Sequence, residues 1–207
     1  MSCTITEMRQ LSSERYELHF SDGNTIKTAF AVVADYSLYT GRELTEAELS
    51  EVLEASALAR CKDRAMRIIS ARPMSERELY DRLVEKGESE QNAAASVAYL
   101  IELHFLDDAE YAAMVVRHYA AKGYGARRVR DELYRRKIPR ELWDEALSQM
   151  PEQEEEIDRL LRSRLRGVEA HDRAQLKKAT DALLRRGFSW DEVRAAVNRY
   201  QAEADFQ

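Results

Sequence analysis

The sequence predicts a mainly α-helical protein, with three tandem three-helix repeats stacked after a small N-terminal β-hairpin and helix extension. Glycine and proline, the strongest helix breakers, number only 7 and 3 in 207 residues. Apolar side chains recur at helical spacing along most of the chain, and from about residue 57 the pattern repeats every 50 residues. The expected divisions are the extension at residues 1–56 and repeats at 57–106, 107–152 and 153–207.

The first part of the chain differs from the rest because its apolar residues alternate. Tyr16, Leu18 and Phe20 are separated by polar residues, which indicates a half-buried strand. The Asp-Gly pair at 22–23 then separates this run from residues 25–28, and such a turn between two strands is typical of a hairpin. Two further elements are expected: a strand over residues 5–11 and a short helix over residues 32–38.

Thr45 and Glu48 have the spacing of a capping box, which opens a long helical pattern reaching about Ile69. The apolar phase slips near Ala57, so the pattern fits either one bent helix or two abutting helices.

The repeats are defined by residues that recur 50 positions apart, such as Leu83, Leu133 and Leu183. Each repeat is expected to hold three helices, and glycines at 87 and 187 supply the left-handed end of the second one. Position 137, which corresponds to these glycines in the second repeat, is lysine. The turn after the second helix of that repeat is therefore expected to have a different backbone conformation. The expected helices are residues 109–121, 126–136 and 141–150 in the second repeat, and 153–166, 173–186 and 190–204 in the third.

Several polar residues stand where helices should begin. Ser75 and Ser189 are candidate helix caps, the former with Glu78 completing a capping box. Asp107 and Asp108 raise the question of a metal site, but an acid at a helix start caps free N–H groups and suits the helix dipole, so capping is the interpretation adopted. Neither the four histidines nor any other set has a ligand or catalytic spacing. The sequence therefore predicts no metal, no cofactor and no enzymatic site.

The net charge of −6 resides entirely in residues 1–56, and the remaining charges are segregated. Residues 122–140 carry eight bases and two acids, and residues 159–186 carry nine bases and three acids. Such blocks are candidate contacts for phosphates or an acidic protein surface. The candidate contact residues are Arg117, Lys122, Arg127, Arg128, Arg130, Arg135, Lys137, Arg162, Arg164, Arg166, Lys177, Lys178 and Arg185.

A structural interpretation competes with binding at these positions. Asp131 with Arg135, and Glu132 with Arg136, have the i,i+4 spacing of ion pairs on a solvated helix. The cations at 86, 136 and 186 recur near a helix end, where the helix dipole already favours them, so a structural role is preferred for these three.

The sequence lacks the patterns that would indicate a membrane location, secretion or a coiled-coil oligomer. It has no run of about 18 apolar residues and no secretory leader pattern, and its two cysteines, Cys3 and Cys61, share no motif spacing. We therefore expect a cytoplasmic protein with reduced thiols and no membrane contact. A monomer is expected because no long heptad seam occurs.

Three segments resemble the motifs of the RecX family, in the family's order and within residues 60–200. They are RPMSEREL at residues 72–79, FLDDAEYA at 105–112 and LRRGFSWD at 184–191, which contain Pro73, Ser75, Asp107, Asp108, Tyr111, Gly187 and Ser189. The resemblance implies three tandem three-helix repeats in an elongated, curved stack. It also implies a protein that binds RecA filaments on single-stranded DNA. It further implies inhibition of RecA's ATP hydrolysis, strand exchange and co-protease function, and loss of filament.

Two other function classes remain open from the sequence. The chain could bind single- or double-stranded DNA directly through helix-turn-helix-like units, against which stand the net charge of −6 and the few aromatic residues among the arginines. An adaptor without a role in recombination is the third class, and only the motif resemblance argues against it.

Overall fold

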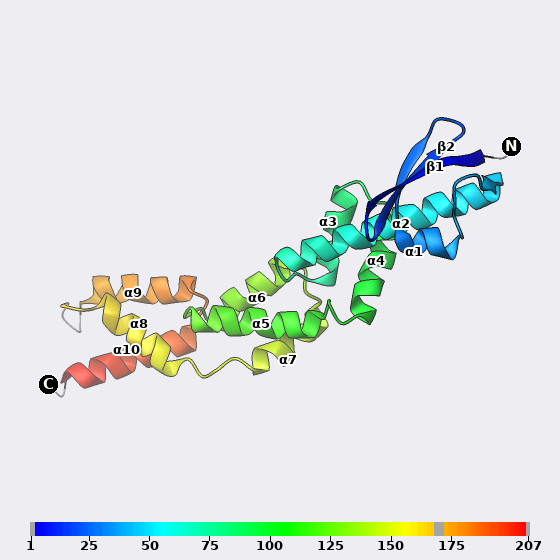
Figure 1. The fold of residues 1–207 in the computed structure, drawn as a ribbon. Coiled ribbons are helices and arrows are strands. Elements are labelled where there is room, and N and C mark those ends of the chain that lie inside the picture. Colours follow the sequence, from blue (N-terminus) through cyan, green and yellow to red (C-terminus); the bar gives the residue numbers. More distant parts are fainter. Residues whose placement is uncertain (1–2, 168–171, 206–207) are drawn as a thin grey trace. The chain divides into compact units, whose positions relative to one another are not determined.

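The computed structural model describes residues 3–167 and 172–205, which form two compact units divided between Leu106 and Asp107 (Figure 1). Helices make up most of the described chain and strands occur only near its N-terminus. The predicted class, mainly α with a small N-terminal β extension, is confirmed. None of the helices in these residues combines the length and apolar character needed to cross a bilayer.

The N-terminal sheet contains the predicted hairpin and third strand. Its strands are β1 (Cys3–Ser12), β2 (Arg15–Phe20), β3 (Thr25–Ala29) and β4 (Glu43–Leu44), in the antiparallel order β3-β2-β1-β4. The hairpin turn is closed by Asp22, whose Oδ1 accepts the Asn24 N–H at 2.9 Å. The two-residue strand β4 is too short to give an alternating pattern. Helix α1 spans Phe30–Asp35, a little earlier than predicted.

Helix α2 (Glu46–Ala71) is one continuous helix of 26 residues, opened by the predicted Thr45–Glu48 capping box. Its first half packs on the sheet, where Val52 joins a core with Ile5 and Leu18. Its second half contributes Cys61 and Ala65 to the core of the first repeat. The division expected after residue 56 therefore falls within this helix.

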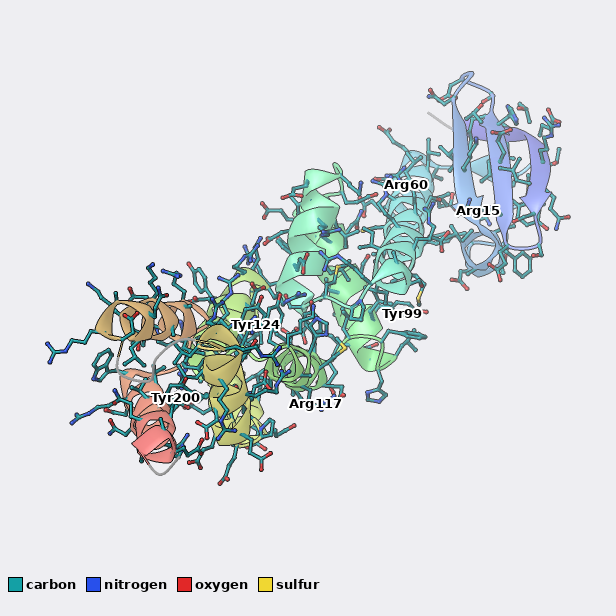
Figure 2. All side chains as sticks on the ribbon, turned by 90° about the vertical axis from the view of Figure 1, so that its left-hand side faces the viewer. Arg15, Arg60, Tyr99, Arg117, Tyr124 and Tyr200 are labelled. Atoms are coloured by element: carbon teal, nitrogen blue, oxygen red, sulfur yellow. The ribbon has the colours of Figure 1, made fainter. Side chains whose placement is uncertain are left out.

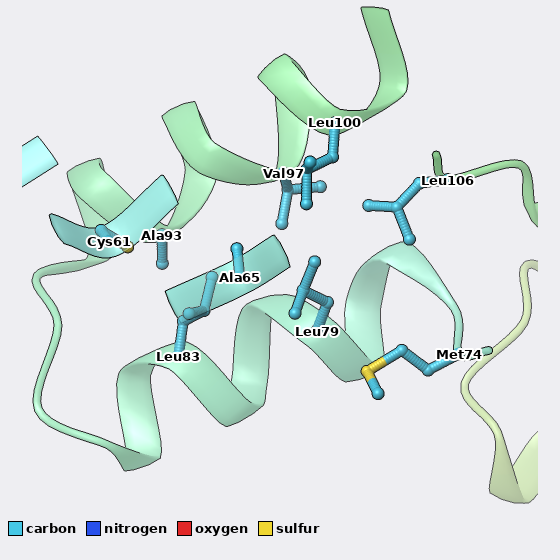
Figure 3. Close-up of a cluster of buried hydrophobic side chains, with 9 residues drawn as sticks. All are labelled: Cys61, Ala65, Met74, Leu79, Leu83, Ala93, Val97, Leu100 and Leu106. Carbon is cyan, nitrogen blue, oxygen red and sulfur yellow. The ribbon is translucent and has the colours of Figure 1, made fainter. Parts of the chain in front are cut away.

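The first repeat is completed by α3 (Glu76–Glu85) and α4 (Glu90–Glu102). Leu79, Leu83 and Leu100 are fully buried between these helices and α2, as Figure 3 shows. Ser75 caps α3, since its hydroxyl accepts the Glu78 N–H at 3.1 Å.

The second unit holds the six helices that the repeat pattern predicts. They are α5 (Asp108–Ala121), α6 (Ala126–Arg135), α7 (Trp143–Ser148), α8 (Glu154–Arg164), α9 (Arg173–Arg185) and α10 (Trp190–Asp205). The third helix of the second repeat begins with a 3-10 turn, η1 (Arg140–Leu142), directly before α7. Leu133 and Leu183, which share one repeat position, are fully buried in two separate cores.

The expectation that the turn at Lys137, after helix α6, differs in conformation from the turns at Gly87 and Gly187 is wrong. Lys137 adopts the same left-handed backbone, with φ of 56° against 86° for Gly87 and 94° for Gly187. Its N–H donates to the Tyr134 carbonyl at 2.9 Å, as the Gly87 N–H donates to Val84 at 2.9 Å. A left-handed conformation costs a side-chain-bearing residue about 1–2 kcal/mol. Burial of the next residue, Ile138, offsets this cost, since Ile138 is 3% exposed.

Candidate partner-binding surface

The candidate surface is centred on α6, the second helix of the second repeat. Val129 and Leu133 turn inward and are fully buried, which leaves the opposite face to solvent. Four residues spaced three, four and three positions apart follow that face and its C-terminal corner, all of them exposed. We call them the α6 stripe: Arg127, Arg130, Tyr134 and Lys137. Tyr134 is 64% exposed, so the stripe offers an aromatic surface as well as cations.

Beside the stripe, the buried carboxylate of Glu132 forms ion pairs with three arginines. Its oxygens lie 3.3 Å from Arg128, 2.8 Å from Arg135 and 4.0 Å from Arg136. The Glu132–Arg136 pair expected from the sequence is thus present, whereas Arg135 binds Glu132 instead of Asp131. Since Glu132 compensates part of the charge of these arginines, Arg127 and Arg130 are the better-placed cations for a partner.

Arg136 serves the core of the second repeat. Its Nη1 donates to the Tyr111 hydroxyl at 2.5 Å, and its guanidinium lies 5.8 Å from the centre of the Tyr111 ring. Burial lowers the pKa of Arg136, but hydrogen bonds with the hydroxyls of Tyr119 and Tyr111 outweigh it and leave the pKa raised. Tyr111 is 5% exposed, as a packing residue should be.

The start of α6 is fixed by backbone contacts with the end of α9. The Gly125 N–H donates to the Arg186 carbonyl at 3.0 Å, and the Arg127 N–H donates to the Gly187 carbonyl at 3.1 Å. In return, the Arg186 guanidinium donates to the Gly123 carbonyl at 3.0 Å. A Cβ at Gly125 would lie 2.4 Å from Gly187 backbone atoms. The second and third repeats therefore meet through close backbone packing, and the stripe begins at this junction.

Helix α9 carries the second exposed basic face. Lys177, Lys178 and Arg185 are exposed on it, as is Arg173, which sequence reasoning missed. Arg173 directly follows the Asp172 cap and stands four residues before Lys177, and this helical spacing was the available signal.

The basic block predicted over residues 159–186 is divided between helices α8 and α9. Arg162 of α8 is directed to α10, where its Nη2 donates to both carboxylate oxygens of Glu203 at 2.8 and 3.0 Å. Arg164 and Arg166 are exposed at and just after the end of α8. Of the remaining candidates, Arg117 pairs with Glu110 at 3.0 Å, and exposed Lys122 lies 6.0 Å from the Tyr119 ring centre.

The motif residues have structural roles. Asp107 Oδ1 accepts the N–H groups of Ala109 and Glu110, each at 2.9 Å, which confirms the capping interpretation, and Asp108 is buried. Ser189 and Glu192 form a reciprocal cap at the start of α10. Exposed Pro73 precedes α3. No group of three or more potential metal ligands occurs in the described parts of the chain, and His171 lies outside them.

These features define a class, a helical protein of tandem three-helix repeats with exposed basic helix faces. Family models for the first, second and third three-helix domains of RecX match residues 61–100, 107–147 and 152–197. The chain therefore belongs to the RecX family, whose curated members are named regulatory proteins.

Individual relatives agree with this assignment. "Regulatory protein RecX" of Vibrio campbellii is 31% identical over 147 residues, covering 70% of this chain and 94% of its own. The protein of the same name from Stenotrophomonas maltophilia is 36% identical over 141 residues, covering 68% and 86%. A crystal structure of regulatory protein RecX shares the fold, with a TM-score of 0.77 at 22% identity, over 95% of this chain and 99% of that one.

Proposed function

We propose that this protein regulates RecA recombinase by binding RecA filaments on single-stranded DNA. Binding inhibits RecA's ATP hydrolysis, strand exchange and co-protease activity, and the protein itself catalyses no reaction. The repeats at residues 57–106, 107–152 and 153–207 present the contact surfaces, and the extension at residues 1–56 is carried by the first repeat. The protein acts as a monomer.

The observation that carries this proposal is the α6 stripe, in a chain whose family is named for regulation. A rigid helix with two outward arginines and an exposed tyrosine suits a partner surface, because arginine and tyrosine dominate binding energy at protein interfaces. The α9 bases, Arg173, Lys177, Lys178 and Arg185, extend the cationic surface available within the same unit.

The test is RecA's ATP hydrolysis on single-stranded DNA while this protein is titrated in. We expect the rate to fall at well below one protein per RecA protomer, because a filament-bound regulator affects many protomers. An unchanged rate at stoichiometric excess, with a folded sample and the RecA of the same organism, would rule the proposal out.

Reversal of two stripe charges should weaken the inhibition. We expect Arg127→Glu/Arg130→Glu to need at least tenfold more protein for half-inhibition, since cations facing the partner become anions. Arg128 is left in place because Glu132 binds it at 3.3 Å. The measurement is the ATPase titration, with circular dichroism to confirm helicity.

The control variant Arg77→Glu/Arg194→Glu changes the net charge by the same amount at exposed sites off the stripe, and it should inhibit RecA as the parent protein does. Equal inhibition by both variants would remove the stripe from the proposed interface.

Direct DNA binding through α6 is the second candidate, favoured by one observation. The first turn of α6 holds Arg127 and Arg128 and no acid, so the charged side chains there favour an anionic partner such as phosphate. Affinity for naked DNA that falls by orders of magnitude between low and moderate salt, together with no effect on RecA, would favour this function.

A further inference from the structure

The first unit is acidic overall, yet the fold gathers most of its bases in one place. Residues 1–106 contain 12 bases and 18 acids. Eight of the bases line two adjoining hollows, whereas only two of the acids, Glu14 and Asp63, do so. The eight bases are Arg15, Lys27, Arg60, Arg64, Arg67, Arg72, Arg82 and Lys86. They are spread over 72 positions of the sequence, so no local charge run marks them.

The first hollow, of about 720 Å³, lies between α2 and α3. Its lining consists of five cations and the apolar Ile68 and Ala71, with no acid. An anion entering it would meet cationic groups from both helices.

The second hollow, of about 610 Å³, lies between the hairpin and α2 and shares Arg64 and Arg67 with the first. Figure 2 shows Arg15 on the sheet and Arg60 on α2 at this junction. Arg15 reaches across it to Asp63, with 3.3 Å between Nη2 and Oδ2. The two hollows thus form one cationic groove along α2, with Arg60, Arg64 and Arg67 in a row spanning about 10 Å of helix.

Two carboxylates, buried Glu88 and half-buried Glu78, bind guanidinium groups of this groove. The Glu88 side chain is 3% exposed and lies 3.1 Å from Arg64 and 3.7 Å from Arg60. Arg64 also donates to the Lys86 carbonyl at 3.0 Å. Glu78 holds Arg82 at 3.3 Å and also binds Arg72. These ion pairs compensate part of the positive charge of the groove, but they also hold its N–H donors in position for a ligand.

Two of the groove's cations, Arg67 and Lys86, are not compensated by a carboxylate in the described ion pairs. Arg67 donates its Nε to the Asp63 backbone carbonyl at 3.2 Å, and its guanidinium has further donors. Both cations are exposed and line the hollow that has no acid.

We propose that this groove binds the phosphodiester backbone of a nucleic acid. A polynucleotide carries one charge per residue on a single covalent chain, so it can engage a row of fixed cations at once, and arginine forks bind phosphate oxygens in pairs. No aromatic residue lines either hollow, so the groove takes the backbone and not the bases. This site is independent of the RecA-directed function proposed above.

The experiment measures binding of the full chain to a fluorescein-labelled 30-nucleotide oligo(dT) by anisotropy, without RecA. We expect Arg67→Glu/Lys86→Glu to bind at least tenfold more weakly at 50 mM salt, because two phosphate contacts are replaced by repulsion. The slope of log affinity against log salt should fall by about 1.4, at about 0.7 for each single-stranded phosphate contact. The neutral variant Arg67→Gln/Lys86→Gln should show a smaller loss with helicity unchanged.

The control Arg9→Glu/Arg77→Glu makes the same charge change outside the groove and should bind within twofold of the parent. Parental affinity in the two groove variants would overturn the proposal. So would loss confined to Arg127→Glu/Arg130→Glu, which would place DNA on the α6 stripe. Binding of fluorescent poly-glutamate that depends on Arg67 and Lys86, without oligo(dT) binding, would overturn it in favour of an acidic protein segment.

Discussion

Gly187→Ala is expected to lower the free energy of unfolding of the second unit by about 2–5 kcal/mol. Gly187 has a left-handed backbone with φ of 94°, which costs an alanine about 1–2 kcal/mol. Its Cβ would also lie 2.4 Å from the Arg128 backbone nitrogen, and such overpacking costs about 1–3 kcal/mol more. Because the clash is with backbone at the junction of two repeats, a side-chain rotation does not relieve it. Urea unfolding followed by circular dichroism measures the loss.

Gly87→Ala supplies the matched control in the first repeat. Gly87 occupies the same repeat position with φ of 86°, but a Cβ there would meet nothing within 4 Å. It should therefore show only the conformational cost of about 1–2 kcal/mol. Equal destabilisation by the two variants would mean that the close packing of α6 on the α9–α10 turn contributes nothing to stability.

Leu133→Ala is expected to destabilise the protein by about 2–5 kcal/mol, as a large-to-small change in a closed core. Leu133 is fully buried with Tyr111, Val116 and Val129, and these neighbours come from two helices that cannot both collapse into the space. The neighbouring Tyr134→Ala, at a side chain 64% exposed, should change stability by no more than about 0.5 kcal/mol. The urea midpoints of the two variants should therefore separate clearly; coincident midpoints would mean that α6 packs in another register.

The helices of the repeats could be predicted from the sequence because each has a strong apolar period and a marked start. Asp107, Ser75 and Ser189 cap the helices that they were expected to open. Strand β4 could not be predicted, since two residues carry no period and its pairing with Cys3 and Thr4 is set by the fold. The left-handed backbone at Lys137 could not be predicted, because lysine rarely adopts this conformation. Burial of Ile138 outweighs the conformational strain at Lys137.

The candidate surface was harder to predict, because charge counts do not show which cations are already paired. Sequence spacing gave Arg136 a partner in Glu132, but it could not show that the same carboxylate also binds Arg128 and Arg135. The basic groove of the first unit could not be predicted from the sequence, because Arg15 and Lys86 are 71 positions apart and come close to the α2 arginines only in the folded chain.

The continuity of α2 has a consequence for how the N-terminal extension behaves. An extension joined by a flexible linker could open, be clipped off or rotate while the rest of the protein stayed folded. Here Val52 and Ala65 belong to different cores but to one helix of 26 residues. Fraying at the sheet must therefore propagate into a helix that the first repeat also stabilises. The backbone amides in the middle of α2, around Ser56, should exchange with solvent only when both cores open together, so that the extension and the first repeat behave as one cooperative unit.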